Sequence, residues 1–477
     1  MSGNPPRSVS ALDKTERAQS DDQNEVDGET SQKKHEPSSL LPTSSDHSVG
    51  QGAFEQYHLT VVLNPASGSR EAARTWLEAE RLLVSVSASS LTWEVIETTG
   101  EGDAERVKEK VQAKEKEGKK QALLVLGGDG TIHDIVNGLL APDAEGKVSK
   151  TAVDLIVVPS GTANALYYSL FPPSSPSYPP DTPLSPFYSL LSFLSSAFPP
   201  FSAPHASASL PFLSSPPRKA SLPLPIALNT LPTSPPSHVL TTVLSSAALH
   251  ASILYDAESL RASHPGVERF KLAAQQNADR WWSGTLRLEG AVKRYSAESK
   301  SWVEKGEHIE VEGEFSYLVS TLVDRFESTF VPAPFRSPLS PLSPASTTTE
   351  GEGSIDLVLI RPMRHIPTAA MVREGKAEEA KKAFIERVWA VSGKMYEEGK
   401  HVEMVYDEGE REDKGEEGKE VVEVYRAKAF EWEPKNPSDA KDRLVCLDGA
   451  LHELVGEDAK LRTNTLGAGE HGVRVWA

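Results

Sequence analysis

The chain reads Leu123-Leu124-Val125-Leu126-Gly127-Gly128-Asp129-Gly130-Thr131, a short apolar run that ends in a glycine-rich turn with one acid at its centre. The run predicts a buried strand, and the apolar periodicity of residues 132–140 predicts an amphipathic helix directly after the turn. Glycines let backbone N–H groups approach a phosphate closely, and a helix N-terminus adds favourable partial charge. Asp129 is therefore placed to receive a proton from an attacking hydroxyl, or to hold a metal that bridges phosphates. The alternative is a purely structural turn, in which Asp129 only satisfies backbone N–H groups.

Two neighbouring segments repeat this arrangement. Strands are predicted at 58–63 and 154–158, and they are followed by the turns Asn64-Pro65-Ala66-Ser67-Gly68 and Pro159-Ser160-Gly161-Thr162-Ala163-Asn164. A helix is predicted over 70–83, with Ala73, Trp76, Leu77 and Val84 on its inner side. The alternation of strands and helices predicts an α/β domain with a parallel sheet and helices on both faces. Because ligands bind at the carboxyl ends of such strands, we expect the three turns to share one edge.

The downstream half has a β-rich pattern, which predicts a mainly antiparallel β-sandwich. Its predicted strands include 222–228, 239–254 and 401–406, and one long helix is predicted over 371–391. We expect residues 1–54 to form a disordered arm, because they contain few large apolar side chains. A nucleotide-binding domain with Pro/Ser-rich loop expansions is predicted over 55–217. The β-rich domain is predicted over 218–477, with flexible loops at about 337–353 and 407–420.

Composition narrows the class of protein. The net charge of −18 disfavours nucleic acid as a partner, and the single cysteine, Cys446, fits a reducing compartment. Neither an apolar signal core nor a run of about 18 apolar residues occurs, so we expect no secretory signal and no membrane span. These features together predict a cytoplasmic protein. The sequence contains no P-loop, no zinc motif and no hydrolase nucleophile elbow. Its one Gly-x-Gly-x-x-Gly match, Gly467 to Gly472, is interpreted as chance, since no strand–turn–helix context is evident around it.

The three turns together resemble the catalytic domain of the diacylglycerol kinase and sphingosine kinase superfamily. The resemblance is carried by Asn64–Gly68, by Gly127–Thr131 with its helix through Leu139, and by Pro159–Leu166. Later segments are more similar to the sphingosine (long-chain base) kinases, namely residues 253–259, 268–270, 330–334, 353–357, 398–403 and 430–434. The resemblance implies a diacylglycerol-kinase-type catalytic domain over 55–217, followed by a lipid-substrate domain.

This resemblance implies an ATP-dependent lipid kinase that uses Mg²⁺. It would transfer the γ-phosphate of ATP to the primary hydroxyl of a sphingoid base, presented at the surface of an intracellular membrane by peripheral contact. Asp129 would be the general base, and Asp256 would bind the sphingoid amine; metal ligands are not assigned. The implied nucleotide-binding residues are Asn64, Pro65, Ser67, Gly68, Thr98, Gly127, Gly128, Gly130, Thr131, Ser160, Gly161, Thr162, Asn164, Arg269 and Asp448.

Several alternatives stay open at this point. Asp256 precedes a predicted helical turn and could be its N-cap, and Arg269 could be an ordinary surface arginine. The acceptor could be diacylglycerol, ceramide or another lipid alcohol, or the chain could be a non-catalytic lipid- or nucleotide-binding relative. Two departures from the family pattern bear on this choice. Ala163 replaces a glycine, which is tolerated if its φ is negative, and Ala450 replaces a glutamate that follows Asp448-Gly449.

Overall fold

The computed structural model describes residues 57–87, 91–197, 221–264, 266, 268–337, 353–410, 419–456 and 459–477. The predicted disordered arm, the Pro/Ser-rich segment at 198–217 and most of the two predicted flexible loops lie outside the described residues. Within these ranges, no helix is long and apolar enough to cross a lipid bilayer.

The upstream part of the chain forms a six-stranded sheet in the described residues, in the order β2-β1-β3-β4-β18-β5. The contiguous pairs from β2 to β18 run parallel, and only β5 pairs antiparallel, with β18. The central strands are continuous apolar runs because both of their faces are covered, and Leu123 to Leu126 are fully buried. The strands are β1 (Tyr57–Leu63), β2 (Trp93–Glu97), β3 (Lys120–Gly127), β4 (Val153–Pro159), β5 (Ser221–Pro223) and β18 (Val473–Trp476).

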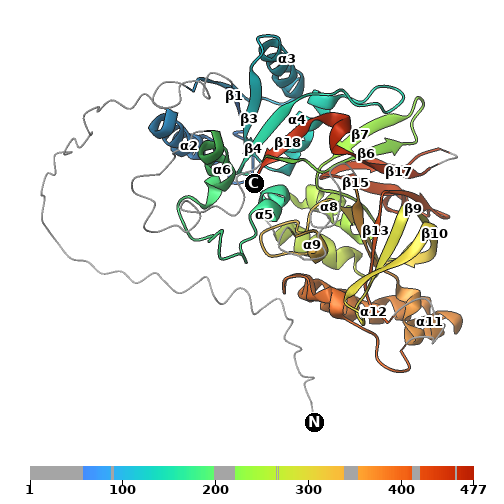
Figure 1. Cartoon of the computed structure of the whole chain (residues 1–477). Coiled ribbons are helices and arrows are strands. Elements are labelled where there is room, and N and C mark those ends of the chain that lie inside the picture. Colours follow the sequence, from blue (N-terminus) through green and yellow to red (C-terminus); the bar gives the residue numbers. More distant parts are fainter. Residues whose placement is uncertain are drawn as a thin grey trace, which may run out of the picture. The chain divides into compact units, whose positions relative to one another are not determined.

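Helices cover both faces of this sheet, with α2 and α6 on one side and α3 and α4 on the other (Figure 1). The amphipathic helix predicted after the glycine turn is confirmed, since the apolar side chains of α4 at 132, 135, 136, 139 and 140 are all buried. The helices of this part are α2 (Ala72–Ser87), α3 (Asp103–Glu115), α4 (Asp129–Leu140), α5 (Ala165–Leu170), η3 (Ser185–Phe187) and α6 (Tyr188–Ala197).

The predicted inner face of α2 is partly wrong. Leu77 and Val84 are 54% and 59% exposed, whereas Trp76 is buried as predicted. The helix instead packs through Ala72, Trp76, Ala79 and Leu83, which follow one another at helical spacing. Small alanines let the helix approach the sheet closely, so the inward face is not the one with the most large apolar residues.

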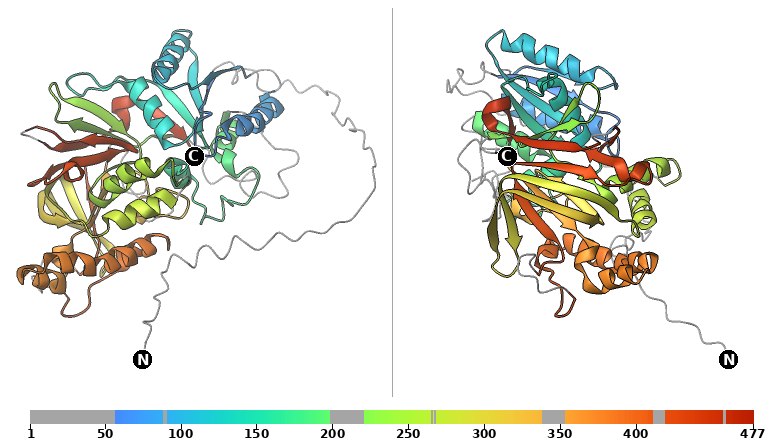
Figure 2. Two further views of the ribbon diagram at one scale, coloured as in Figure 1. Left: turned by 180° about the vertical axis from the view of Figure 1, so that it is seen from behind. Right: turned by 90° about the vertical axis from the view of Figure 1, so that its right-hand side faces the viewer.

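The downstream part forms a twelve-stranded antiparallel sheet among the described residues, in the order β16-β15-β8-β11-β12-β13-β9-β14-β17-β6-β7, with β10 paired to β9. Figure 2 shows the yellow β9–β10 hairpin next to the orange helices α11 and α12. The predicted fold class, an α/β domain followed by a mainly antiparallel β domain, is confirmed. The strands are β6 (Ile226–Leu231), β7 (Ser237–Thr241), β8 (Leu244–Ala247), β9 (Trp282–Ser296), β10 (Ser301–Phe315), β11 (Tyr317–Thr321), β12 (Ile355–Ile360), β13 (Glu423–Ala427), β14 (Ala429–Pro434), β15 (Leu444–Leu447), β16 (Ala450–Glu453) and β17 (Leu461–Leu466).

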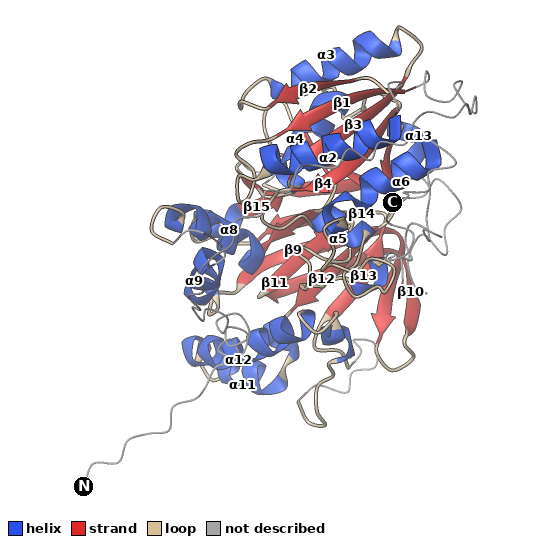
Figure 3. Cartoon of the chain, turned by 90° about the vertical axis from the view of Figure 1, so that its left-hand side faces the viewer, coloured by secondary structure: helices blue, strands red, loops and turns tan. Residues whose placement is uncertain are grey.

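Helical segments lie outside this sheet, and Figure 3 shows α8 and α9 as a pair beside its strands. They are α8 (Ala248–Leu260), α9 (Glu268–Asn277), η4 (Pro334–Arg336), η5 (Pro362–Arg364), α11 (Ile366–Arg373), α12 (Ala377–Met395), η6 (Lys400–Glu403), η7 (Ala440–Arg443) and α13 (Ala468–His471).

Three predicted elements of this part are corrected. The strand predicted over 239–254 ends at Ala247, and Ala248, with φ at 55°, starts α8. The single helix predicted over 371–391 is two helices, separated at Gly375, whose φ of 79° interrupts the helical path. The first half of the strand predicted over 401–406 belongs to the 3₁₀ turn η6 (Lys400–Glu403).

Two strands from the downstream part of the chain belong to the first sheet. The strand predicted over 222–228 is broken by prolines into β5, which joins the first sheet, and β6, which joins the second. At the other end of the chain, β18 pairs with β4, so residues 473–476 belong to the first sheet. The domain boundary at 217/218 stays a prediction, and two short strands downstream of it complete the upstream sheet.

Candidate active site

The three predicted turns meet at one edge of the parallel sheet, as expected. The backbone N–H of Asn64 donates to Leu126 at 3.0 Å, and the N–H of Ser160 donates to Gly127 at 3.0 Å. Both contacts continue the hydrogen-bond pattern of adjacent parallel strands beyond the ends of β1 and β4. The turns therefore hold one another in place through their backbones, directly after the strands that carry them.

Glycines are needed here because the turns touch. A Cβ on Gly128 would lie 2.9 Å from the Gly161 Cα, and a Cβ on Gly161 would overlap the Gly128 Cα. Gly68 has φ at +50°, and its Cβ would collide with the Ser160 carbonyl oxygen. Gly127 has Thr131 against the position of its missing side chain. Glycine is consequently required at these positions by the close approach of the turns.

Amide and hydroxyl side chains complete the turns. Asn64 Oδ1 accepts from the Ala66 N–H at 3.0 Å, and Asn64 Nδ2 donates to Thr131 Oγ1 at 2.8 Å. Asn164 adopts a left-handed backbone with φ at 57°, and its side chain exchanges two hydrogen bonds with the Gly161 backbone, at 2.8 and 2.9 Å. The left-handed position is thus Asn164. Ala163 is absent from the described non-glycine residues with positive φ, so its methyl group is tolerated.

Asp129 lies between the N-termini of two helices. It is the first residue of α4, and its two carboxylate oxygens accept from the N–H groups of Ala165 at 2.8 Å and Leu166 at 3.0 Å, which begin α5. Burial raises the pKa of the Asp129 carboxyl to about 6. The two N–H donors lower this pKa and the Asp448 carboxylate raises it further, but burial has the largest effect. Asp129 is therefore ionised at neutral pH, with its proton affinity raised toward the operating range of a general base.

The other predicted nucleotide-binding residues lie around this centre. Thr98 follows β2, and its N–H donates to Leu63 at 2.8 Å, which brings it to the end of β1. Pro65 and Ser67 are half-buried, and Thr162 and Gly130 are exposed. The hydroxyl of Ser160 is buried and has no hydrogen-bond partner among the described residues. An unsatisfied buried donor, close-packed glycines and two helix N-termini are a donor set that fits phosphate groups.

Asp448 lies in a buried turn of the second sheet. Its carboxylate is fully buried and accepts from the N–H groups of Thr242, Val243 and Leu244 at 2.7 to 2.9 Å, and from the Thr242 hydroxyl at 3.2 Å. It thereby closes the turn between β7 and β8. His133 Nδ1, on α4, lies 3.4 Å from the same carboxylate. Although burial disfavours the imidazolium, Asp448 raises the pKa of His133. Asp448 acts on the site through His133 and Asp129; its direct contact with a nucleotide stays a prediction.

Arg269 makes no hydrogen bond or ion pair with the three turns among the described residues. It is on α9 and lines a pocket of about 290 Å³ between α8, α9 and the β15–β16 turn, where Gly449 also lies. Its guanidinium stacks on the Phe270 ring at 4.5 Å, and no ion pair is made by it in the described part of the chain. Neighbouring Arg261 is paired with Glu258 at 2.7 Å. A half-buried arginine without an acid partner at a pocket mouth is available to an anionic ligand.

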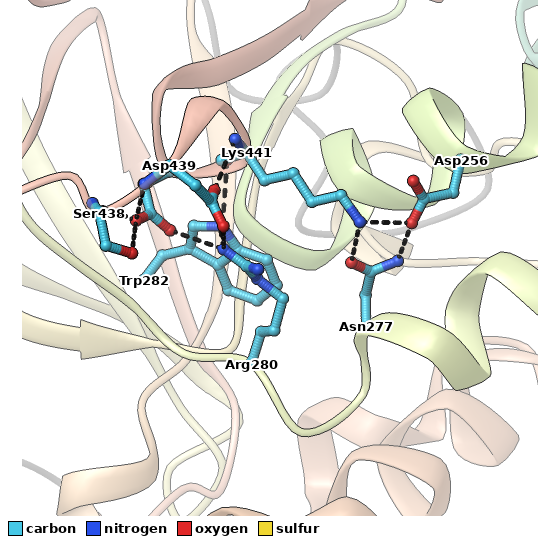
Figure 4. A network of polar contacts seen from close by, with 8 residues as sticks. Asp256, Asn277, Arg280, Trp282, Ser438, Asp439 and Lys441 are labelled. Carbon is cyan, nitrogen blue, oxygen red and sulfur yellow. Dashed lines mark hydrogen bonds and ion pairs between the residues drawn. The ribbon is translucent and has the colours of Figure 1, made fainter. Parts of the chain in front are cut away.

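Asp256 is neither an N-cap nor a free acid. It lies within α8, which begins eight residues earlier at Ala248, so the N-cap alternative is wrong. Its Oδ2 accepts from Asn277 Nδ2 and from Lys441 Nζ, both at 2.6 Å, and Lys441 also donates to Asn277 Oδ1 at 3.0 Å (Figure 4). The predicted amine-binding carboxylate is therefore already paired with a cation of the chain.

Sequence reasoning missed Asn137 and Lys441. Asn137 follows Asp129 at two helical turns and binds the backbone of Leu240 in the second sheet, and its place in the quoted α4 motif was the only available signal. Lys441 lies in a polar segment that carries no motif.

The Gly467–Gly472 match does follow a strand, β17, and opens the four-residue helix α13, contrary to the prediction. Because β17 is antiparallel and α13 is a single turn, this match is still no dinucleotide site.

A parallel sheet whose strand-end turns meet around one half-buried carboxylate is an arrangement typical of phosphoryl-transfer sites. Residues 58–184 match the family described as "Diacylglycerol kinase catalytic domain". This part of the chain is thus similar to that family, and the predicted resemblance to sphingosine kinase-like lipid kinases is confirmed.

Individual relatives are similar over a part of the chain. Acylglycerol kinase, mitochondrial, from Xenopus laevis is 34% identical over 113 residues, which are 24% of this chain and 24% of that protein. Sphingosine kinase 1 is 31% identical over 113 residues in Caenorhabditis elegans (24% of this chain, 23% of that protein) and 33% identical over 111 residues in Homo sapiens (23% and 27%). The chain therefore matches about a quarter of the length of these curated relatives.

Proposed function

We propose that this protein is an ATP-dependent lipid kinase that transfers the γ-phosphate of ATP to the primary hydroxyl of a sphingoid long-chain base, giving the 1-phosphate. The observation that carries the proposal is the position of Asp129, an acid with a raised pKa among three glycine-containing turns at one sheet edge. The match of residues 58–184 to the diacylglycerol kinase catalytic domain supports the reaction type.

Different residues of the chain have different roles in the proposed phosphoryl transfer. The N–H groups of the glycine turns and the Ser160 hydroxyl bind phosphate oxygens, and Arg269 adds positive charge from α9. Asp129 accepts the proton of the lipid hydroxyl as that oxygen attacks phosphorus, so the nucleophile is a stronger donor when the bond to the leaving ADP breaks. The N–H groups of Ala165 and Leu166 hold the carboxylate in place without using all of its lone pairs.

The phosphates of the nucleotide would supply ligands of Mg²⁺ at this site. In the described ranges, no group of three or more His, Cys, Asp or Glu side chains could hold a metal. Mg²⁺ is commonly bound by one or two carboxylates together with substrate phosphates and waters, so Asp129 is the carboxylate of this chain that would contact it. When bound, the ion neutralises phosphate charge.

Recognition of the sphingoid amine would fall to Asp256, whose carboxylate suits a cationic head group. A second candidate is favoured by a specific contact. Because Lys441 already neutralises Asp256, an uncharged lipid alcohol such as diacylglycerol or ceramide meets no unpaired acid there. We further propose that the lipid is presented at the surface of intracellular membranes and that the protein works from the cytoplasm by peripheral contact.

A radiolabelled γ-phosphate transfer assay tests the function. Purified protein, Mg²⁺ and labelled ATP are mixed with sphingosine, phytosphingosine, ceramide or diacylglycerol in detergent micelles. Labelled sphingoid phosphate supports the primary proposal, and labelled phosphatidate or ceramide phosphate alone supports the second candidate. ATP binding without transfer to any lipid contradicts both.

A further inference from the structure

The Lys441–Asp256–Asn277 contact is a built arrangement that joins three distant segments. Asp256 comes from α8, Asn277 is the last residue of α9, and Lys441 lies in η7 ahead of β15. Asn277 is fixed in addition by donating to the Ala273 carbonyl at 2.8 Å. The hydrogen bonds from Asn277 and Lys441 both go to Oδ2 of Asp256, and Oδ1 accepts none within the described part of the chain. The Lys441 ammonium thus binds one of the two carboxylate oxygens of Asp256.

The backbone of the segment that carries Lys441 is fixed by hydrogen bonds and ion pairs of its own. Asp439 caps η7 by accepting from the Lys441 N–H at 2.8 Å, and the Asp442 carboxylate accepts from the Ser438 N–H at 2.6 Å. Arg280 bridges Asp439 at 2.9 Å and Asp442 at 3.0 Å (Figure 4). Because the backbone at 441 is fixed by these contacts, its ammonium is presented to Asp256 at low entropic cost.

The Lys441–Asp256 ion pair is partly exposed to solvent. The Lys441 side chain is 25% exposed and that of Asp256 is 15% exposed, so the pair is reached by solvent and is not sealed in the core. A second ammonium at the same carboxylate would face Lys441 at close range, and like charges this near repel strongly outside bulk water. A cationic lipid head group must therefore displace Lys441, whereas an uncharged one need not.

We infer that Lys441 determines head-group specificity, by acting as a built-in competitor for the site at which Asp256 would receive a lipid ammonium. This inference rests on the proposed lipid kinase function and adds a residue to it. Lys441 weakens the binding of a protonated sphingoid amine relative to an uncharged lipid alcohol with the same hydroxyl. It touches neither phosphate nor reacting hydroxyl, so it changes the KM for the lipid and leaves the KM for ATP alone.

The experiment compares wild type with Lys441→Met, which keeps the length of the side chain and removes its charge. Sphingosine and N-acetylsphingosine serve as matched lipids, because they share the hydroxyl and the base chain and differ in charge. Binding is measured in detergent micelles without ATP, and phosphate transfer is measured separately. We expect Lys441→Met to tighten sphingosine binding and lower its KM by roughly tenfold or more, with little change for N-acetylsphingosine.

Three controls separate this role from a structural one. Lys441→Arg keeps the charge and should keep the wild-type ratio between the two lipids. Lys435→Met removes a lysine that pairs with Glu433 instead of Asp256, and it should leave the ratio unchanged. Asp256→Asn combined with Lys441→Met should lose the gain for sphingosine, because the acceptor carboxylate is gone.

The outcomes are distinguishable from a failure of the proposed function. If no lipid is phosphorylated by wild type, the kinase proposal fails, while the binding ratio still reports on Lys441. An unchanged ratio in Lys441→Met, an equal change for both lipids, or no lipid binding at all overturns the inference. A folded Lys441→Met protein that prefers sphingosine more strongly than wild type, with the same KM for ATP, supports it.

Discussion

Asn137 and Leu240 exchange two hydrogen bonds between α4 and the second sheet. Asn137 Nδ2 donates to the Leu240 carbonyl at 2.9 Å, and Asn137 Oδ1 accepts from the Leu240 N–H at 2.8 Å. The helix that begins with Asp129 is therefore anchored to β7 two turns further on. His133 reaches Asp448 from the same helix, so the turn that carries Asp129 and the second sheet are coupled through α4.

Asn137→Ala should lower the free energy of unfolding by about 1–3 kcal/mol, because it leaves a backbone donor and acceptor of Leu240 without their partner. Chemical denaturation followed by circular dichroism measures this loss. Gln112→Ala, on the exposed side of α3, is the matched control and should change stability little. Equal stability of the two variants would show that the Asn137 contact contributes nothing to the fold.

Asp129→Asn should reduce turnover by roughly 10²–10⁴-fold while the protein stays folded and binds ATP. The amide has the size of the carboxylate but cannot take up the hydroxyl proton. Single-turnover phosphate transfer and nucleotide titration, performed on the same preparation, separate the two effects. Turnover near that of wild type would remove Asp129 from the role of base.

The pH dependence of transfer should show an acidic limb with an apparent pKa of about 6, since burial raises the pKa of Asp129 to that value. Activity should rise as the carboxyl ionises through this range. An unfolded aspartate has a pKa near 3.9. The stability contributed by the raised folded-state pKa is therefore complete below about pH 4 and is lost as the pH rises through 6. A rate profile that stays flat down to pH 5 would contradict this assignment.

Gly161→Ala should weaken ATP binding and destabilise the site, because its Cβ would overlap the Gly128 Cα. Gly130→Ala is a sharper probe, since a Cβ there meets nothing within 4 Å in the described structure. It should fold normally, so a loss of ATP affinity would report contact with the nucleotide itself. Gly393→Ala, in α12 and equally open, is the control for helix stability and should bind ATP as wild type does. Isothermal titration with ATP and thermal unfolding measure both effects, and unchanged ATP affinity in Gly161→Ala would exclude the turn from the site.

Much of the catalytic half could be predicted because its signals are local. A continuous apolar strand, a turn of glycines and a periodic helix specify α4 and its position after β3, whatever the rest of the chain does. The predictions that were wrong concern segments whose sequence pattern is compatible with two structures, so that only tertiary packing distinguishes them. On α2 two faces had the right spacing, and the sheet selected the one with small alanines over the one with Leu77 and Val84. Residues 248–254 were assigned to a strand because a short apolar run does not distinguish strand from buried helix.

The sequence by itself determined the α/β architecture, the three turns at one sheet edge and the place of Asp129 among them. These depend on chain sterics and on neighbours within a few residues. Only the tertiary structure decided what surrounds the predicted ligand-binding acids. Asp256 and Lys441 are 185 positions apart, and nothing local tells which of the 50 lysines and arginines will reach a given carboxylate. Asp448 likewise became the acceptor that closes the β7–β8 turn, because burial forces a charged group to find every available donor.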